Sequence, residues 1–167
     1  MKRLLVPTLF AVVSTMSFGI QAATAPAATQ SQNAEHKLNA YEEIMVGKVW
    51  TTTEALDQNK KEVSADDKQV SNFFGLAEYY PDGTFNMTTF DGKPKMKGDW
   101  SFDENGKTRS LTAKNDQGEV LFTRVVENVT VTPEEYTYRI YPEQDNKDKY
   151  FDIVHKVKKI IFLWMPL

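Results

Sequence analysis

Two arginines stand at strand positions where the alternation of inward and outward side chains predicts an apolar residue. Arg109 shares a face with Leu111, and Arg124 shares a face with Phe122 and Val126. An arginine on an inward face must pair with an acid, stack on an aromatic ring or hold an anionic ligand. Two roles follow for these residues: a cation inside a ligand cavity, or a structural arginine that is paired within the protein.

The ligand hypothesis is supported by aromatic side chains on the predicted inward faces. With Arg109 and Arg124 they would line a cavity for an apolar or anionic ligand, and they are Trp50, Tyr79, Trp100, Phe122 and Tyr138. Arg139 is the eighth candidate for this site. The structural alternative gives an arginine a partner within the fold: Glu54, Glu78, Asp152 or the ring of Trp50. This alternative stays open because buried charges usually have a partner in the protein.

Catalytic and metal chemistry have little support in the sequence. His155 lies at i+3 from Asp152 on a predicted strand, which directs the two side chains to opposite faces. Two metal ligands on one strand need to stand at i and i+2, so no metal site is expected. The motifs of serine hydrolases, zinc proteases and nucleotide-binding loops do not occur. An enzyme therefore ranks behind a binding protein and an interaction protein, and no cofactor is expected.

Short strands joined by tight turns account for most of the chain after Gly47. Turn glycines at 83, 92, 106 and 118 are typical of antiparallel hairpins. The predicted strands cover residues 48–56, 76–80, 84–90, 96–102, 108–114, 120–131, 135–141 and 150–157. No helix-length segment lies between them, so parallel βαβ units are excluded. We predict an all-β fold, an up-and-down antiparallel barrel with one short N-terminal helix within residues 35–46; a two-sheet sandwich is the alternative.

Several motifs in these strands resemble those of one protein family. They are GKVW at 47–50, GLAEYYPDGTF at 75–85, GDWS at 98–101, NDQG at 115–118 and EYTYRI at 135–140. Over residues 47–156 the chain resembles a bacterial family of exported proteins known as domain of unknown function number 4822, with a lipocalin-like barrel. The resemblance implies no catalytic residue. Lipocalins often pack an arginine of a late strand across the first-strand tryptophan, which implies that Arg139 crosses Trp50.

Composition and segment order indicate an exported globular domain. The chain has 167 residues, 20 Lys+Arg against 23 Asp+Glu, a net charge of -3 and no cysteine. The absence of cysteine excludes disulfide scaffolds and thiol chemistry. The slightly acidic balance argues against a nucleic-acid-binding protein, which would need a basic surface. Residues 1–23 are typical of a signal peptide, cleaved after Ala22 or Ala23, and residues 24–34 of a flexible leader. The barrel domain is predicted over residues 35–158.

The last predicted segment is an apolar C-terminal tail, residues 159–167, which is too short to span a bilayer. No transmembrane span is expected in the mature chain. We predict a protein that a cleaved signal peptide exports to the periplasm or the cell exterior. The leading function is binding of a small ligand in the barrel. The alternative is a non-enzymatic envelope structural, stress or inhibitor protein that acts through its loops or through the tail, in contact with a membrane surface or a protein.

Overall fold

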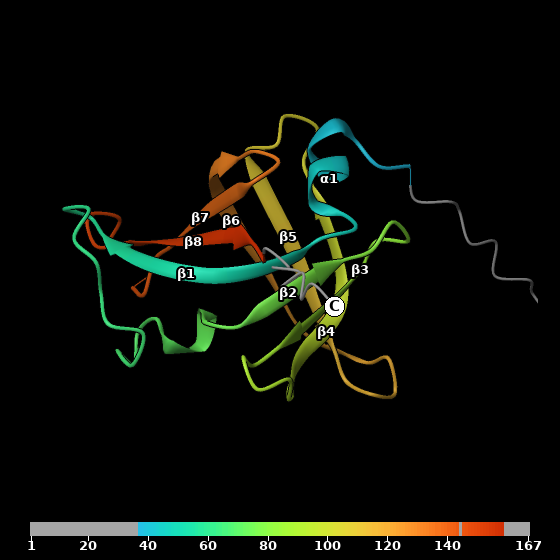
Figure 1. Cartoon of the computed structure of the whole chain (residues 1–167), viewed down its shortest axis with the longest axis horizontal. Helices are drawn as coiled ribbons and strands as arrows, with labels where there is room; N and C mark the ends of the chain where they lie inside the picture. The colour runs from blue at the N-terminus through green and yellow to red at the C-terminus, as the bar shows by residue number, and fades with distance from the viewer. Residues whose placement is uncertain (1–36, 144, 159–167) are drawn as a thin grey trace, which may run out of the picture. The chain divides into compact units, whose positions relative to one another are not determined.

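Eight antiparallel strands close into one barrel in the computed structural model, which describes residues 37–143 and 145–158 (Figure 1). Each strand pairs with its neighbour in the sequence, and β8 pairs back onto β1. The strands are β1 (Val49–Asp57), β2 (Leu76–Tyr79), β3 (Thr84–Thr88), β4 (Pro94–Phe102), β5 (Thr108–Lys114), β6 (Val120–Val131), β7 (Glu135–Ile140) and β8 (Phe151–Val157). The predicted up-and-down barrel is confirmed, and the sandwich alternative is excluded. The predicted signal peptide, leader and tail lie outside the described residues.

A short helix, α1 (Ala40–Met45), covers one end of the barrel. It begins later than the sequence pattern suggested because Asn39 caps it: the Asn39 side chain accepts from the backbone N–H of Glu42, while the Glu42 side chain accepts from that of Asn39. The other carboxylate oxygen of Glu42 accepts from the backbone N–H of Phe102, at 2.9 Å. A helix this short depends on such tertiary contacts for its stability.

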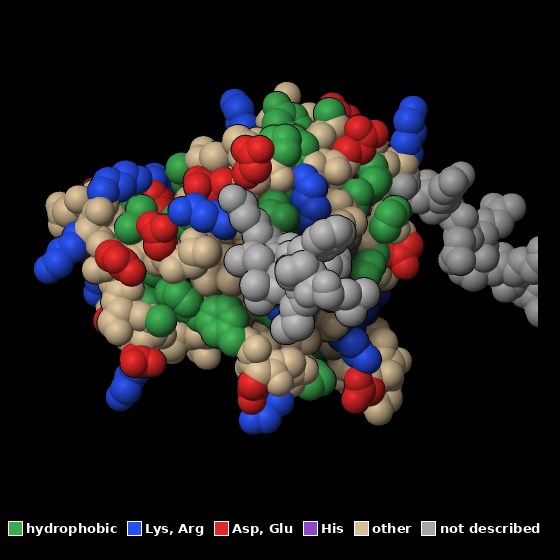
Figure 2. Space-filling model, in the orientation of Figure 1, with side chains coloured by type: hydrophobic (Ala, Val, Ile, Leu, Met, Phe, Trp, Pro, Cys, Tyr) green, Lys and Arg blue, Asp and Glu red, His purple; other side chains and the backbone are tan. Residues whose placement is uncertain are grey.

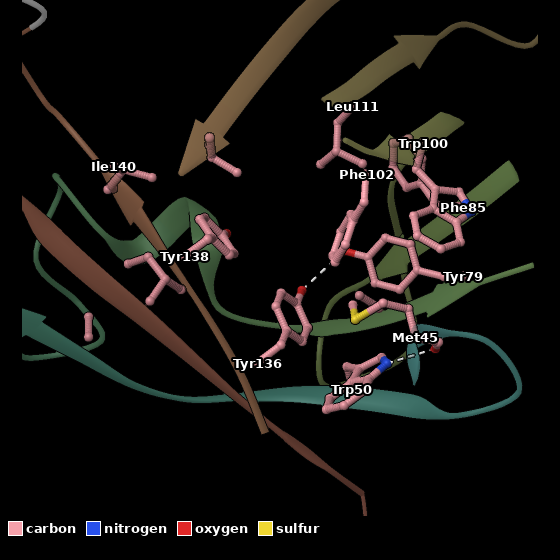
Figure 3. Close-up of a cluster of buried hydrophobic side chains, with 14 of the residues drawn as sticks. Met45, Trp50, Tyr79, Phe85, Trp100, Phe102, Leu111, Tyr136, Tyr138 and Ile140 are labelled. Atoms are coloured by element: carbon pink, nitrogen blue, oxygen red, sulfur yellow. Dashed lines mark hydrogen bonds between the residues drawn. The ribbon is translucent and has the colours of Figure 1, made fainter. Parts of the chain in front are cut away.

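Aromatic side chains fill the barrel below α1. Figure 3 shows Trp50, Tyr79 and Tyr136 directed toward one another. The Trp50 ring meets the Tyr136 ring edge to face, with centroids 5.0 Å apart, and its indole N–H donates to the Met45 carbonyl at 2.9 Å. Burial of such rings supplies most of the stabilisation in a barrel without disulfides. This half of the barrel is therefore a packed core.

Strands β4 and β5 approach each other closely at Gly98. A Cβ atom at this position would lie 1.9 Å from the Thr112 carbonyl oxygen, and the Gly98 φ is +156°. Only glycine fits such a contact without moving a strand. Glycine at position 98 therefore allows β4 and β5 to lie this close.

The other end of the barrel is covered by the long connection from β1 to β2, residues 58–75, which contains the 3-10 turn η1 (Ser71–Phe73). The Thr52 hydroxyl donates to the Phe73 carbonyl at 2.8 Å. The ammonium group of Lys95 donates to the carbonyls of Asn72 and Phe74, at 3.0 and 2.7 Å. These bonds fix residues 71–75 over the barrel opening. Within the described ranges, no helix is long and apolar enough to cross a membrane.

Candidate functional site

A cavity of about 360 Å³ lies in the half of the barrel away from α1, next to η1. Its apolar wall includes Phe73, Phe74, Met87, Met96, Leu111, Phe122 and Val126. Its polar groups include Thr52, Lys95, Arg109, Arg124, Tyr138 and His155. Every strand of the barrel contributes at least one lining residue. The cavity is thus built by the whole fold, and it is of a size and composition that suit a small amphipathic ligand.

Arg109 lies at the inner end of this cavity and is only 1% exposed. One guanidinium nitrogen, Nη1, donates to the hydroxyls of Tyr79 and Tyr136. The guanidinium carbon also lies 4.4 Å from the centroid of the Tyr138 ring, a cation–π distance. In contrast, the buried Nε–H has no acceptor, and in the described part of the chain no carboxylate forms an ion pair with Arg109. The buried charge is solvated by tyrosines but not neutralised.

Arg139 shows how a guanidinium group of this protein binds a carboxylate when one is within reach. Its Nε donates to Oδ1 of Asp152 at 2.8 Å, and its Nη2 donates to Oδ2 at 3.1 Å. Burial raises the pKa of Asp152, but hydrogen bonds from Arg139 and then from Lys60 outweigh it and hold the pKa below its usual value. This pair lies outside the cavity lining. The bidentate contact is the geometry that a carboxylate would adopt with a free arginine edge.

The buried imidazole of His155 lies next to Arg109 on the cavity floor. It stacks on Tyr136 with ring centroids 4.3 Å apart, and its Nε2 lies 2.9 Å from the Thr52 hydroxyl. Because that hydroxyl donates to the Phe73 carbonyl, Nε2 is assigned as the protonated nitrogen of a neutral ring. Burial, and then the positive charge of Arg109, lower the pKa of His155 to about 3. The floor therefore has one positive charge at neutral pH.

Two further cations lie at the cavity mouth. The Arg124 guanidinium carbon is 5.4 Å from the ring centroid of Phe73 and 5.7 Å from that of Phe122. No ion pair of Arg124 occurs among the described residues, and burial lowers the pKa of Lys95 below its usual value. No Asp or Glu of the described chain lines the cavity. By contrast, Figure 2 shows acidic and basic side chains intermixed on the face of the molecule that it draws.

The structure places four of the eight predicted site residues in the cavity lining: Arg109, Phe122, Arg124 and Tyr138. Three others, Trp50, Tyr79 and Trp100, point inward but fill the core below α1 and do not line the cavity. The implied packing of Arg139 across Trp50 is wrong. Arg139 follows the inward-facing Tyr138 on β7, so its side chain points outward, to Asp152 and over the Tyr150 ring.

Sequence reasoning missed several cavity residues. Thr52 and His155 carry a signal in the sequence, because each alternates with a residue of the core, Trp50 and Ile153 respectively. Phe73 and Lys95 carry none, since residues 58–75 have no periodic pattern and the lysine reads as exposed. Their place in the site follows from the docking of η1 over the barrel.

A second hollow, of about 730 Å³, lies between β6, the end of β7 and the loop that follows it. It shares Phe73, Arg124 and Val126 with the cavity. Its lining contains the cations Arg124, Arg139 and Lys147 together with the acids Glu127 and Asp145. The second hollow therefore differs from the cavity in having acids among its described lining residues. Across the described ranges, no three potential metal-ligating side chains come together.

Comparison with known proteins identifies a family and one solved structure of weak similarity. A biogenic amine-binding protein, solved as a selenomethionine derivative, is 13% identical, with a TM-score of 0.39 over 73% of this chain and 68% of that one. No curated protein sequence matches the chain. A family model described as a domain of unknown function, DUF4822, matches residues 42–161, which include all eight strands. The chain therefore belongs to the DUF4822 family.

Proposed function

We propose that the barrel binds a small organic anion with an apolar body. The observation that carries the proposal is the uncompensated charge of the cavity: Arg109, Arg124 and Lys95 line it, and no acid among the described residues does. A buried cation without a counter-ion is costly, and an anionic ligand removes that cost. The anionic group would accept from the orphaned Nε–H of Arg109. The apolar body would contact Met87, Met96, Leu111 and Phe122.

The same charge argues against an amine as the ligand. The structural relative is described as binding biogenic amines, which are cations at neutral pH and need acidic partners. In this chain a protonated amine would meet like charges at the floor and at the mouth of the cavity. Like charges at short range in a low-dielectric site repel strongly. An anion-binding cavity and an amine-binding cavity are therefore expected to rank an acid and an amine of equal chain length in opposite order.

Isothermal titration calorimetry with three ten-carbon probes tests the proposal. Decanoate should bind, while decanol should bind weakly and decylamine should not bind. Arg109→Met should weaken decanoate roughly thirtyfold or more, which is the effect of truncating one partner of a buried charge pair. Lys93→Gln is the matched control, because Lys93 is an exposed cation on a hairpin tip and should leave affinity unchanged. Equal binding of decanoate to wild type and Arg109→Met would refute the proposal.

Thermal unfolding of Arg109→Met separates loss of binding from loss of fold. Methionine has a similar apolar length and removes a buried charge that has no acid partner. The hydroxyls of Tyr79 and Tyr136 remain bonded to each other, at 3.0 Å. The ligand-free variant should therefore melt at the same temperature as wild type or higher. A large fall in its melting temperature would show that Arg109 has a structural role.

We further propose that the protein is exported by a cleaved signal peptide, as residues 1–23 of the sequence suggest. The segment has a basic start, an apolar run and small residues at its end. Expression of the full chain in a bacterial host, followed by N-terminal sequencing of the purified protein, tests this. Export predicts a mature chain that begins at Ala23 or Thr24, in the periplasmic or extracellular fraction. An intact N-terminus in the cytoplasmic fraction would refute it.

A further inference from the structure

The two arginines of the cavity belong to neighbouring strands, β5 and β6. In the strand register, Arg109 pairs with Val126 and Leu111 pairs with Arg124. Arg109 and Arg124 are therefore diagonal neighbours on the inward face, and such positions are about 7–8 Å apart. Both side chains line the same cavity. The ligand space thus has two guanidinium groups at different depths along one wall.

Neither arginine is neutralised within the described chain. Arg109 uses Nη1 on two tyrosine hydroxyls, and its Nε has no acceptor. Arg124 contacts the rings of Phe73 and Phe122 but forms no ion pair. The third cation, Lys95, is held by two backbone carbonyls. One anionic group can neutralise Arg109 only, which would leave the mouth positive.

From this arrangement we infer that the preferred ligand has two anionic groups joined by an apolar linker. The inner group binds Arg109, and the outer group binds Arg124 between the rings of Phe73 and Phe122. The linker crosses the apolar stretch of wall that Leu111 and Val126, the other two corners of this diagonal, provide between the two cations. This inference rests on the proposed function, since it assigns the ligand class of the same cavity. An α,ω-dicarboxylate is the simplest compound of this class, and a carboxylate can bind a guanidinium bidentately.

Arg124 is more exposed than Arg109, and this exposure limits how much affinity a second anionic group can add. Exposed ion pairs contribute up to about 1 kcal/mol, which corresponds to roughly a fivefold change in affinity. The inner pair should dominate affinity, while the outer pair should distinguish diacids from monoacids. The two arginines therefore have separable signatures: Arg109 variants weaken monoacids and diacids alike, and Arg124 variants weaken diacids more than monoacids.

The experiment compares succinate, adipate, suberate and sebacate with the monoacids of equal length by calorimetry, above pH 6 and at constant ionic strength. At one chain length or more, the diacid should bind about fivefold more tightly than its monoacid. Arg124→Gln should abolish this preference by weakening each diacid about fivefold more than its monoacid. Lys93→Gln should retain it.

Three results would overturn the inference. If the monoacids bind in an Arg109-dependent way but no diacid binds more tightly, the inference fails and the proposed function stands. If Arg124→Gln weakens diacids and monoacids equally, Arg124 acts on the ligand body and the second anionic site is wrong. If no acid of either series binds, the proposed function and the inference fail together. The melting temperatures of Arg124→Gln and Lys93→Gln, which are expected to equal that of wild type, show that each variant is folded.

Discussion

Acidification should destabilise this protein through one buried histidine. His155 is enclosed by Tyr136, Tyr138 and Thr52, and the charged group that faces it is Arg109. Burial and the arginine lower the pKa of His155 from 6.5 to about 3 in the folded protein. Below pH 6.5 the unfolded chain binds a proton at this residue and the folded chain does not. Stability therefore falls as the pH falls, until the folded pKa is reached.

The size of the loss follows from proton linkage. Each pH unit in which only the unfolded chain is protonated costs about 1.4 kcal/mol. Between about pH 7.5 and 4.5, the free energy of unfolding should therefore fall by about 2–3 kcal/mol from His155 alone. Carboxylates titrate mainly at the lower end of this window and below it, because their usual pKa values lie near or below 4.3. The histidine contribution can thus be read before general acid unfolding begins.

Urea unfolding across this pH range, followed by tryptophan fluorescence, measures the slope. His155→Gln should be less stable at neutral pH because it loses the ring stack, but its stability should be almost independent of pH above 4.5. His36→Gln changes the other histidine of the chain and should keep the wild-type slope. A wild-type slope in His155→Gln would refute the reasoning. So would an imidazole NMR signal of His155 that titrates above pH 5.

Three substitutions outside the cavity test a close strand contact and a buried ion pair, with denaturant midpoints as the measurement. Gly98→Ala should lower the free energy of unfolding by about 3 kcal/mol, because its Cβ would lie 1.9 Å from the Thr112 carbonyl oxygen. Gly92→Ala, which meets nothing within 4 Å at a φ of +83°, should cost only about 1 kcal/mol, and equal losses would contradict the close contact. Asp152→Asn should cost about 3 kcal/mol at neutral pH, because it breaks the buried pair with Arg139. Since pairing lowers the pKa of Asp152, this difference should vanish as the pH falls through that pKa, and its persistence at low pH would refute an ionic origin.

The barrel could be predicted from the sequence because its local signals agree with one another. Turn glycines mark the hairpin ends, and β4 alternates Met96, Gly98, Trp100 and Phe102 on one face, all of them inward in the structure. A one-residue slip would expose that whole face, so the pattern fixes the register. The connection over residues 58–75 has no such pattern. Its position depends on long-range bonds to Thr52 and Lys95, which no local rule reveals.

Arg139 shows how a family-based expectation can override a better local argument. The lipocalin resemblance implied that Arg139 crosses Trp50. Tyr138 precedes Arg139 on the same strand and faces inward, so alternation alone directs Arg139 outward. The structure agrees with the alternation, and Lys48 is the cation that lies over Trp50, 5.4 Å from the ring centroid. Within one strand, period-two geometry was the stronger evidence.

Among the described residues Arg109 has no counter-ion, and the alternation of side chains along the strands explains why. The sequence offered three acids as partners: Glu54, Glu78 and Asp152. Each directly precedes a residue of the packed core on its strand, namely Ala55, Tyr79 and Ile153. Because neighbours on a strand face opposite sides, all three acids must point out of the barrel. There Glu54 pairs with Lys156 and Asp152 with Arg139. The chain carries a net charge of -3, yet its fold directs these acids outward and leaves an arginine within, and that separation of charge is the physical basis of the anion binding that we propose.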